Sequence, residues 1–86
     1  MKEKSAFRKA VNELPNLREM VILDIAEAAH VHRSCVYTWM SRLDRVPRKI
    51  FREKILEVMN REKYVQFFGH KSAEDLWPGY DHENGF

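Results

Sequence analysis

The sequence has little of what stabilises a protein covalently or anchors it in a membrane. Its 86 residues include one cysteine, Cys35, so no disulfide forms within the chain and stability has to come from packing. The longest apolar run, Met20 to Leu23, is far too short to span a bilayer. Residues 1–5 are dominated by charge, and no apolar stretch of a secretion signal follows them. We therefore expect a cytoplasmic protein with no membrane partner.

Patterns typical of enzymes and metalloproteins are also lacking. With three glycines, the chain contains no glycine-rich phosphate loop, and it shows neither paired carboxylates in an apolar setting nor a nucleophile with a nearby base. His30, His32 and Cys35 lie close in sequence, but a structural zinc site needs four ligands and no fourth stands nearby. We expect no catalytic activity, no cofactor, no metal and no small-molecule substrate.

Charge is present but unevenly distributed. The net charge is only +2, yet the stretch from Arg33 to Lys54 contains seven basic and two acidic residues. From Gly69 onward a single lysine faces four acidic residues. A basic centre of this kind is typical of a nucleic-acid-binding surface, although basic clusters also occur as plain solvated surface.

Hydrophobic periodicity predicts an all-α fold, a bundle of four to five helices in a single domain. Helices are predicted at about 5–14, 17–29, 33–42 and 47–60, while 64–68 is only weakly predicted as helical because its aromatic and β-branched residues also suit a strand. The apolar faces are formed by Phe7, Ala10, Val11 and Leu14; by Leu17, Met20, Val21, Ile25, Ala26 and Ala29; by Val36, Trp39, Met40 and Leu43; and by Ile50, Phe51, Ile55, Val58 and Met59.

Several residues predict where the helices begin and end. Asn16, which follows a proline, is placed to cap the second helix. Pro47 suits the first position of the fourth helix, because the N–H that it lacks would have no partner there. The residue type of Gly69 predicts the end of a helix there, and Ser72 with Asp75 resembles a capping pattern for one short turn.

Residues 22–42 meet the steric demands of a helix-turn-helix motif. Ala26 provides the small residue where the two helices cross, and Val31, five positions later, is the apolar residue that seals the turn. Val36 and Trp39, three positions apart, are placed to anchor the second helix to the core. A plain helical hairpin would bury the same residues, so the polar and basic outer face of the second helix is what favours DNA.

The segments Ile25–Ala29 and Arg33–Trp39, with Val46-Pro47 after them, resemble the helix-turn-helix of phage Cro-type repressors and related small phage activators. The resemblance covers about residues 23–59. It implies that the helix at 33–42 enters the major groove of double-stranded DNA and that the protein binds as a homodimer on two half-sites. In place of His30 that family usually has glycine, because the backbone there tends to be left-handed, and a serine or similar cap is common in place of His32.

The resemblance also implies the residues of the interface. Those nearest the bases are His32, Arg33, Ser34, Tyr37, Thr38 and Ser41. Arg33 is suited to guanine through two parallel hydrogen bonds, and we expect Arg33 and Thr38 to contribute most. Phosphate contacts that add affinity without sequence preference are expected from Arg42, Arg45, Arg48 and Lys49.

We therefore expect residues 1–68 to form a helix-turn-helix DNA-binding domain and 69–86 to form a C-terminal tail. The aromatic residues near the end of the chain exceed the needs of so small a core, so the tail packs either on the core or in a dimer interface. The predicted function is a sequence-specific DNA-binding transcriptional regulator, a phage or prophage repressor that binds operator DNA. The alternative is a helical protein-interaction adaptor, antitoxin-like or anti-repressor-like.

Overall fold

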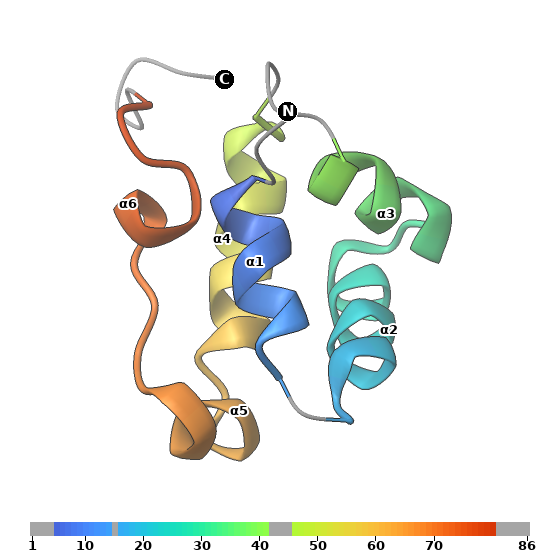
Figure 1. Cartoon of the computed structure of the whole chain (residues 1–86). Helices are drawn as coiled ribbons and strands as arrows, with labels where there is room; N and C mark the ends of the chain where they lie inside the picture. Colours follow the sequence, from blue (N-terminus) through green and yellow to red (C-terminus); the bar gives the residue numbers. More distant parts are fainter. Residues whose placement is uncertain (1–4, 15, 42–45, 81–86) are drawn as a thin grey trace.

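The computed structural model describes residues 5–14, 16–41 and 46–80, and within these ranges the chain contains six helices and no strand (Figure 1). The all-α prediction is confirmed. The helices are α1 (Ala6–Asn12), α2 (Arg18–Ala29), α3 (Arg33–Ser41), α4 (Lys49–Met59), α5 (Glu62–Phe68) and α6 (Ala73–Leu76). The described residues contain six helices, more than the four to five predicted, because the weakly predicted segment at 62–68 is helical and the short turn at 73–76 also closes into a helix.

Helix α2 packs against α1, α3 and α4, and α1 also packs against α6. The first helix begins at Ser5, whose hydroxyl accepts a hydrogen bond from the Arg8 N–H at 3.0 Å. The same hydroxyl donates to the carbonyl of Met40 at 2.8 Å. Ser5 therefore joins the amino end of α1 to the last turn of α3.

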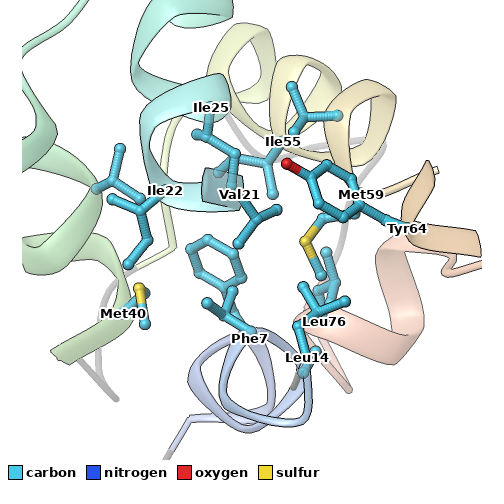
Figure 2. Close-up of a cluster of buried hydrophobic side chains, with 14 of the residues drawn as sticks. Phe7, Leu14, Val21, Ile22, Ile25, Met40, Ile55, Met59, Tyr64 and Leu76 are labelled. Carbon is cyan, nitrogen blue, oxygen red and sulfur yellow. The ribbon is translucent and has the colours of Figure 1, made fainter. Parts of the chain in front are cut away.

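One hydrophobic core unites all six helices. In Figure 2 the ring of Phe7 points from α1 toward Val21 of α2, with Met40 of α3 to one side. Phe7 also meets Trp77, their ring centroids 5.9 Å apart, so the segment after α6 helps to close the core. The buried apolar residues are Phe7, Ala10, Val11, Leu14, Val21, Ile22, Ile25, Ala26, Val36, Met40, Ile55, Val58, Met59, Tyr64, Leu76 and Trp77.

Two predicted helix starts are wrong. Asn16 does not cap α2: the residue at the cap position is Leu17, which has no side-chain capping bond, and Asn16 itself has a positive φ of 62°. Pro47 does not begin α4, because Arg48 is the cap residue and Lys49 the first helical residue. The carbonyl of Pro47, which precedes the cap residue, accepts a hydrogen bond from Nη1 of Arg52 at 2.6 Å.

Two residues predicted on apolar faces lie on the surface. Met20 is 47% exposed and Ile50 is 61% exposed. In α2 the run Met20 to Leu23 contains no polar residue to mark the outer side, and the helix buries Val21 and Ile22 instead. In α4 the first turn leaves Ile50 outside the core.

The predicted helix end at Gly69 and the predicted cap at Ser72 are confirmed. Gly69 ends α5 with φ 74°, a left-handed value that glycine adopts without strain. Ser72 and Asp75 form a capping box: the Ser72 hydroxyl accepts from the Asp75 N–H at 3.2 Å, and the Asp75 carboxylate accepts from the Ser72 N–H at 2.8 Å. This cap fixes α6, and Leu76 is buried in the core.

A polar cluster ties α2 to α5 at the edge of the core. Asp24 accepts a hydrogen bond from the hydroxyl of buried Tyr64 at 2.6 Å. Its carboxylate also forms ion pairs with Nζ of Lys63 at 2.8 Å and with Nη1 of Arg61 at 3.8 Å. Partial burial alone would raise the pKa of Asp24, but the hydrogen bonds from Lys63 and Tyr64 and the nearby positive charges outweigh it, so the pKa is lowered. The carboxylate therefore stabilises the fold in its charged form.

We predict that Asp24→Asn lowers the free energy of unfolding at neutral pH by about 1–3 kcal/mol, because charged hydrogen bonds to Lys63 and Tyr64 are lost. Since the folded pKa lies below the unfolded value of about 3.9, the contribution is complete above that value and vanishes as pH falls through the folded pKa. Urea unfolding of both proteins at neutral and acidic pH measures it. Glu57→Gln, which removes only loose surface pairs at 3.9 Å, is the control and should change stability little. A stability difference that persists unchanged at acidic pH would contradict this account.

Candidate nucleic-acid interface

The turn between α2 and α3 is closed by backbone hydrogen bonds around His30. This residue has φ 56° and ψ 44°, the left-handed conformation that glycine adopts most easily. The N–H of Val31 donates to the carbonyl of Ala26 at 3.0 Å, and the N–H of His30 donates to the carbonyl of Glu27 at 3.2 Å. These two bonds form a Schellman motif, in which an apolar contact between Val31 and the last turn of α2 is typical. The turn therefore keeps the left-handed geometry although it lacks glycine.

His32 takes the capping place at the start of α3. Its Nδ1 accepts a hydrogen bond from the Ser34 N–H at 3.1 Å and lies 3.0 Å from the Ser34 hydroxyl. Accepting a backbone N–H needs a lone pair on Nδ1, so in this contact the ring N–H is on Nε2. His32 is exposed, and the N–H on its other nitrogen is left to face solvent or a ligand.

The inner face of α3 fixes how the helix is rotated. Val36 is fully buried and Met40 nearly so, both in the common core. Trp39 is only half-buried and lies against Phe51 of α4, with ring centroids 5.1 Å apart. Of the predicted motif residues, Ala26 and Val36 are buried, whereas Val31 and Trp39 are half-buried and pack against the core.

The outer face of α3 is polar and accessible. Arg33, Ser34, Thr38 and Ser41 are all exposed, together with His32 just before the helix. The Thr38 hydroxyl donates to the carbonyl of Ser34 at 3.0 Å, and the Ser41 hydroxyl donates to the carbonyl of Tyr37 at 2.9 Å. Each of these hydroxyl oxygens keeps lone pairs that can accept a further bond. The face thus presents a guanidinium and several hydroxyl groups, which suits hydrogen bonding to base edges.

Tyr37 differs from the other predicted base-contacting residues. It is half-buried, and its hydroxyl donates to both carboxylate oxygens of Glu19 in α2, at 2.8 and 2.6 Å. The hydrogen bond to Glu19 is the main cause that raises the pKa of Tyr37. Sequence reasoning missed Glu19, because eighteen residues separate it from Tyr37 and no periodicity links them.

Two of the four residues predicted to contact phosphate lie among the described residues. Arg48 and Lys49 are exposed at the start of α4, whose first turn contains no acidic residue. Arg42 and Arg45, like Leu43, lie outside the described residues. Arg52 belongs to the same basic stretch, but it is 2% exposed and its guanidinium stands 4.9 Å over the ring of Tyr80, so it is not part of the surface.

The comparisons with known protein families, with curated proteins and with solved structures give no match. None of the helices in the described part of the chain has the length and hydrophobicity that a membrane span requires. In the same part of the chain, no group of three or more His, Cys, Asp or Glu side chains is arranged to hold a metal ion.

We predict that His30→Gly raises the free energy of unfolding by about 1 kcal/mol, because glycine adopts the left-handed conformation of this turn without a Cβ penalty. His30 is exposed, so the substitution leaves the core intact. Thermal and urea unfolding measure the gain. His30→Ala is the matched control, since it removes the same imidazole but keeps the Cβ, and it should bring no gain. A glycine variant less stable than the alanine variant would show that the turn geometry is misassigned.

Proposed function

We propose that this protein is a sequence-specific DNA-binding transcriptional regulator, a repressor of the phage type that acts on operator DNA. In this proposal α2 and α3 form the helix-turn-helix, and α3 enters the major groove. The single observation that supports it most is the two-sided character of α3. Val36 and Met40 fix the helix to the core, and the opposite side presents only polar or charged groups to solvent.

The turn geometry supports the same proposal. His30 has the left-handed backbone that the resemblance to Cro-type repressors implies for this position, and His32 serves as the cap of α3 in place of a serine. Arg33, directly after the cap, projects from the first turn of α3, the part of a recognition helix that contacts base edges. Arg33 is thus our first candidate for a base contact.

Arg48 and Lys49 are our candidates for phosphate contacts. They are exposed in consecutive positions at the start of α4, on the segment that follows α3. Positive side chains at this end of a helix are unfavourable to its dipole, so their position is not explained by helix stability. We further propose that the protein binds as a homodimer, because one helix contacts too few base pairs for useful specificity.

The second candidate function is a protein-interaction adaptor. The observation that favours it is the exposure of Met20 and Leu23 on one side of α2, at 47% and 49%. Apolar side chains that remain in solvent are suited to a protein partner when they form a patch. Salt dependence of duplex binding separates the two functions.

We predict that the protein binds duplex DNA with an affinity that falls steeply with salt, with a log–log slope of about −0.9 for each phosphate contacted. Genomic fragments that the purified protein binds are first selected. A selected and a random duplex of equal length are then titrated with the protein over a salt series. The selected duplex should bind more tightly at every salt concentration. Absence of binding to any duplex would favour the adaptor.

We predict that Arg33→Ala costs about 1–3 kcal/mol of binding free energy on the selected duplex and relaxes the preference at one base position. Arg48→Ala should instead weaken selected and random duplexes alike, because a phosphate contact carries no sequence information. Both side chains are exposed, so neither substitution should change the unfolding transition. Equal losses on both duplexes for Arg33→Ala would exclude its role as a base contact.

A further inference from the structure

A chain of polar contacts joins α1, α2 and α3 at the edge of the proposed interface. Nε of Arg18 donates to the side-chain carbonyl of Asn12 at 2.8 Å, and Nη1 of Arg18 pairs with Glu19 at 3.0 Å. The Tyr37 hydroxyl donates to both oxygens of the same Glu19 carboxylate, and the Arg18 guanidinium stands 5.6 Å from the centre of the Tyr37 ring. Glu19 is therefore the acceptor on which Arg18 and Tyr37 both converge.

This cluster lies beside the outer face of α3. Tyr37 is four residues after Arg33 and four before Ser41, so the three side chains follow one line along the helix. The Ser41 hydroxyl also bonds the carbonyl of Tyr37. A DNA phosphate that borders the groove occupied by α3 would lie close to this line.

The Glu19 carboxylate engages two groups that are otherwise suited to bind phosphate. Guanidinium and phenol groups both donate to phosphate oxygens. Here Arg18 and Tyr37 donate to Glu19, whose side chain is 58% exposed and whose charge offsets that of Arg18. At this edge both donors are already engaged by the Glu19 carboxylate, and its negative charge repels a phosphate.

We propose that Glu19 limits the affinity of the interface for DNA, because its carboxylate holds Arg18 and Tyr37 in a contact that a phosphate would otherwise make. This inference rests on the proposed DNA-binding function. Glu19 acts through its two partners and is a positioning residue rather than a contact residue. The cluster thereby sets the strength of the sequence-independent part of binding.

The test is a double-mutant cycle on the full chain, with the selected and the random duplex measured over a salt series. Glu19→Gln and Glu19→Ala should each raise the affinity for both duplexes by about three- to tenfold at low salt, as one added phosphate contact would. The log–log slope should become steeper by about 0.9. Arg18→Gln should change little in the unaltered protein, but it should cancel the gain when combined with Glu19→Gln.

Glu62→Gln is the matched control, because it removes the same charge from the exposed first turn of α5, on another part of the surface. It should leave the slope unchanged. If both Glu19 variants bind no more tightly than the control, or if Arg18→Gln has the same effect with and without Glu19, the inference is overturned and the cluster serves only the fold. If the unaltered protein binds no duplex, the proposed function itself fails and this inference fails with it.

Discussion

The burial of Val36 and Met40 decides which side of α3 faces outward, and the rest of the proposed interface depends on it. Both side chains lie in the common core, four residues apart on one face of the helix. Because helical side chains keep fixed angular positions, residues on the opposite side have to project into solvent. The Ser5 hydroxyl reinforces this orientation where it bonds the Met40 carbonyl, one of the end carbonyls that lacks a partner within its helix.

Asp24 and Glu19, the two acidic residues of α2 that contact neighbouring helices, have different roles. Asp24 is 20% exposed at its side chain and holds buried Tyr64 and Lys63, so its charge contributes to the stability of the fold. Glu19 is 58% exposed, and screening by water makes its ion pair with Arg18 weak as a source of stability. The same exposure leaves the Glu19 charge able to influence a charged ligand. The stability of the fold therefore depends more on Asp24, and the charge of the surface beside α3 depends more on Glu19.

Residues with a strong local preference allowed the best predictions from sequence. Gly69 ends its helix, and Ser72 with Asp75 caps α6, since these effects involve neighbours in the chain. The polar outer face of α3 followed from its clear helical period. In contrast, the uniform run Met20 to Leu23 contains no polar residue to tell the buried side from the exposed side, and Met20 was assigned wrongly.

Contacts between segments far apart in the chain could not be predicted from the sequence. Arg52 is one of the seven basic residues of the stretch Arg33 to Lys54, yet the structure buries it against the Pro47 carbonyl and the Tyr80 ring. Likewise, Tyr37 shares the helical face of the other predicted base contacts, but Glu19 engages its hydroxyl. A sequence pattern gives the angular position of a side chain on its own helix, whereas the partner it meets depends on the tertiary arrangement.

The distribution of exposed apolar groups bears on what the α3 surface can bind. Among the described residues the large exposed hydrophobic side chains are Met20, Leu23, Ile50 and Phe67, and they lie on α2, α4 and α5. Protein interfaces bury an apolar or aromatic centre within a polar rim, whereas on the outer face of α3 the one aromatic residue, Tyr37, is half-buried and its hydroxyl is engaged by Glu19. Its guanidinium and hydroxyl groups instead match a partner whose surface is made of hydrogen-bonding edges and phosphates. A protein partner, if one binds, has its apolar contacts on α2, α4 or α5 rather than on α3.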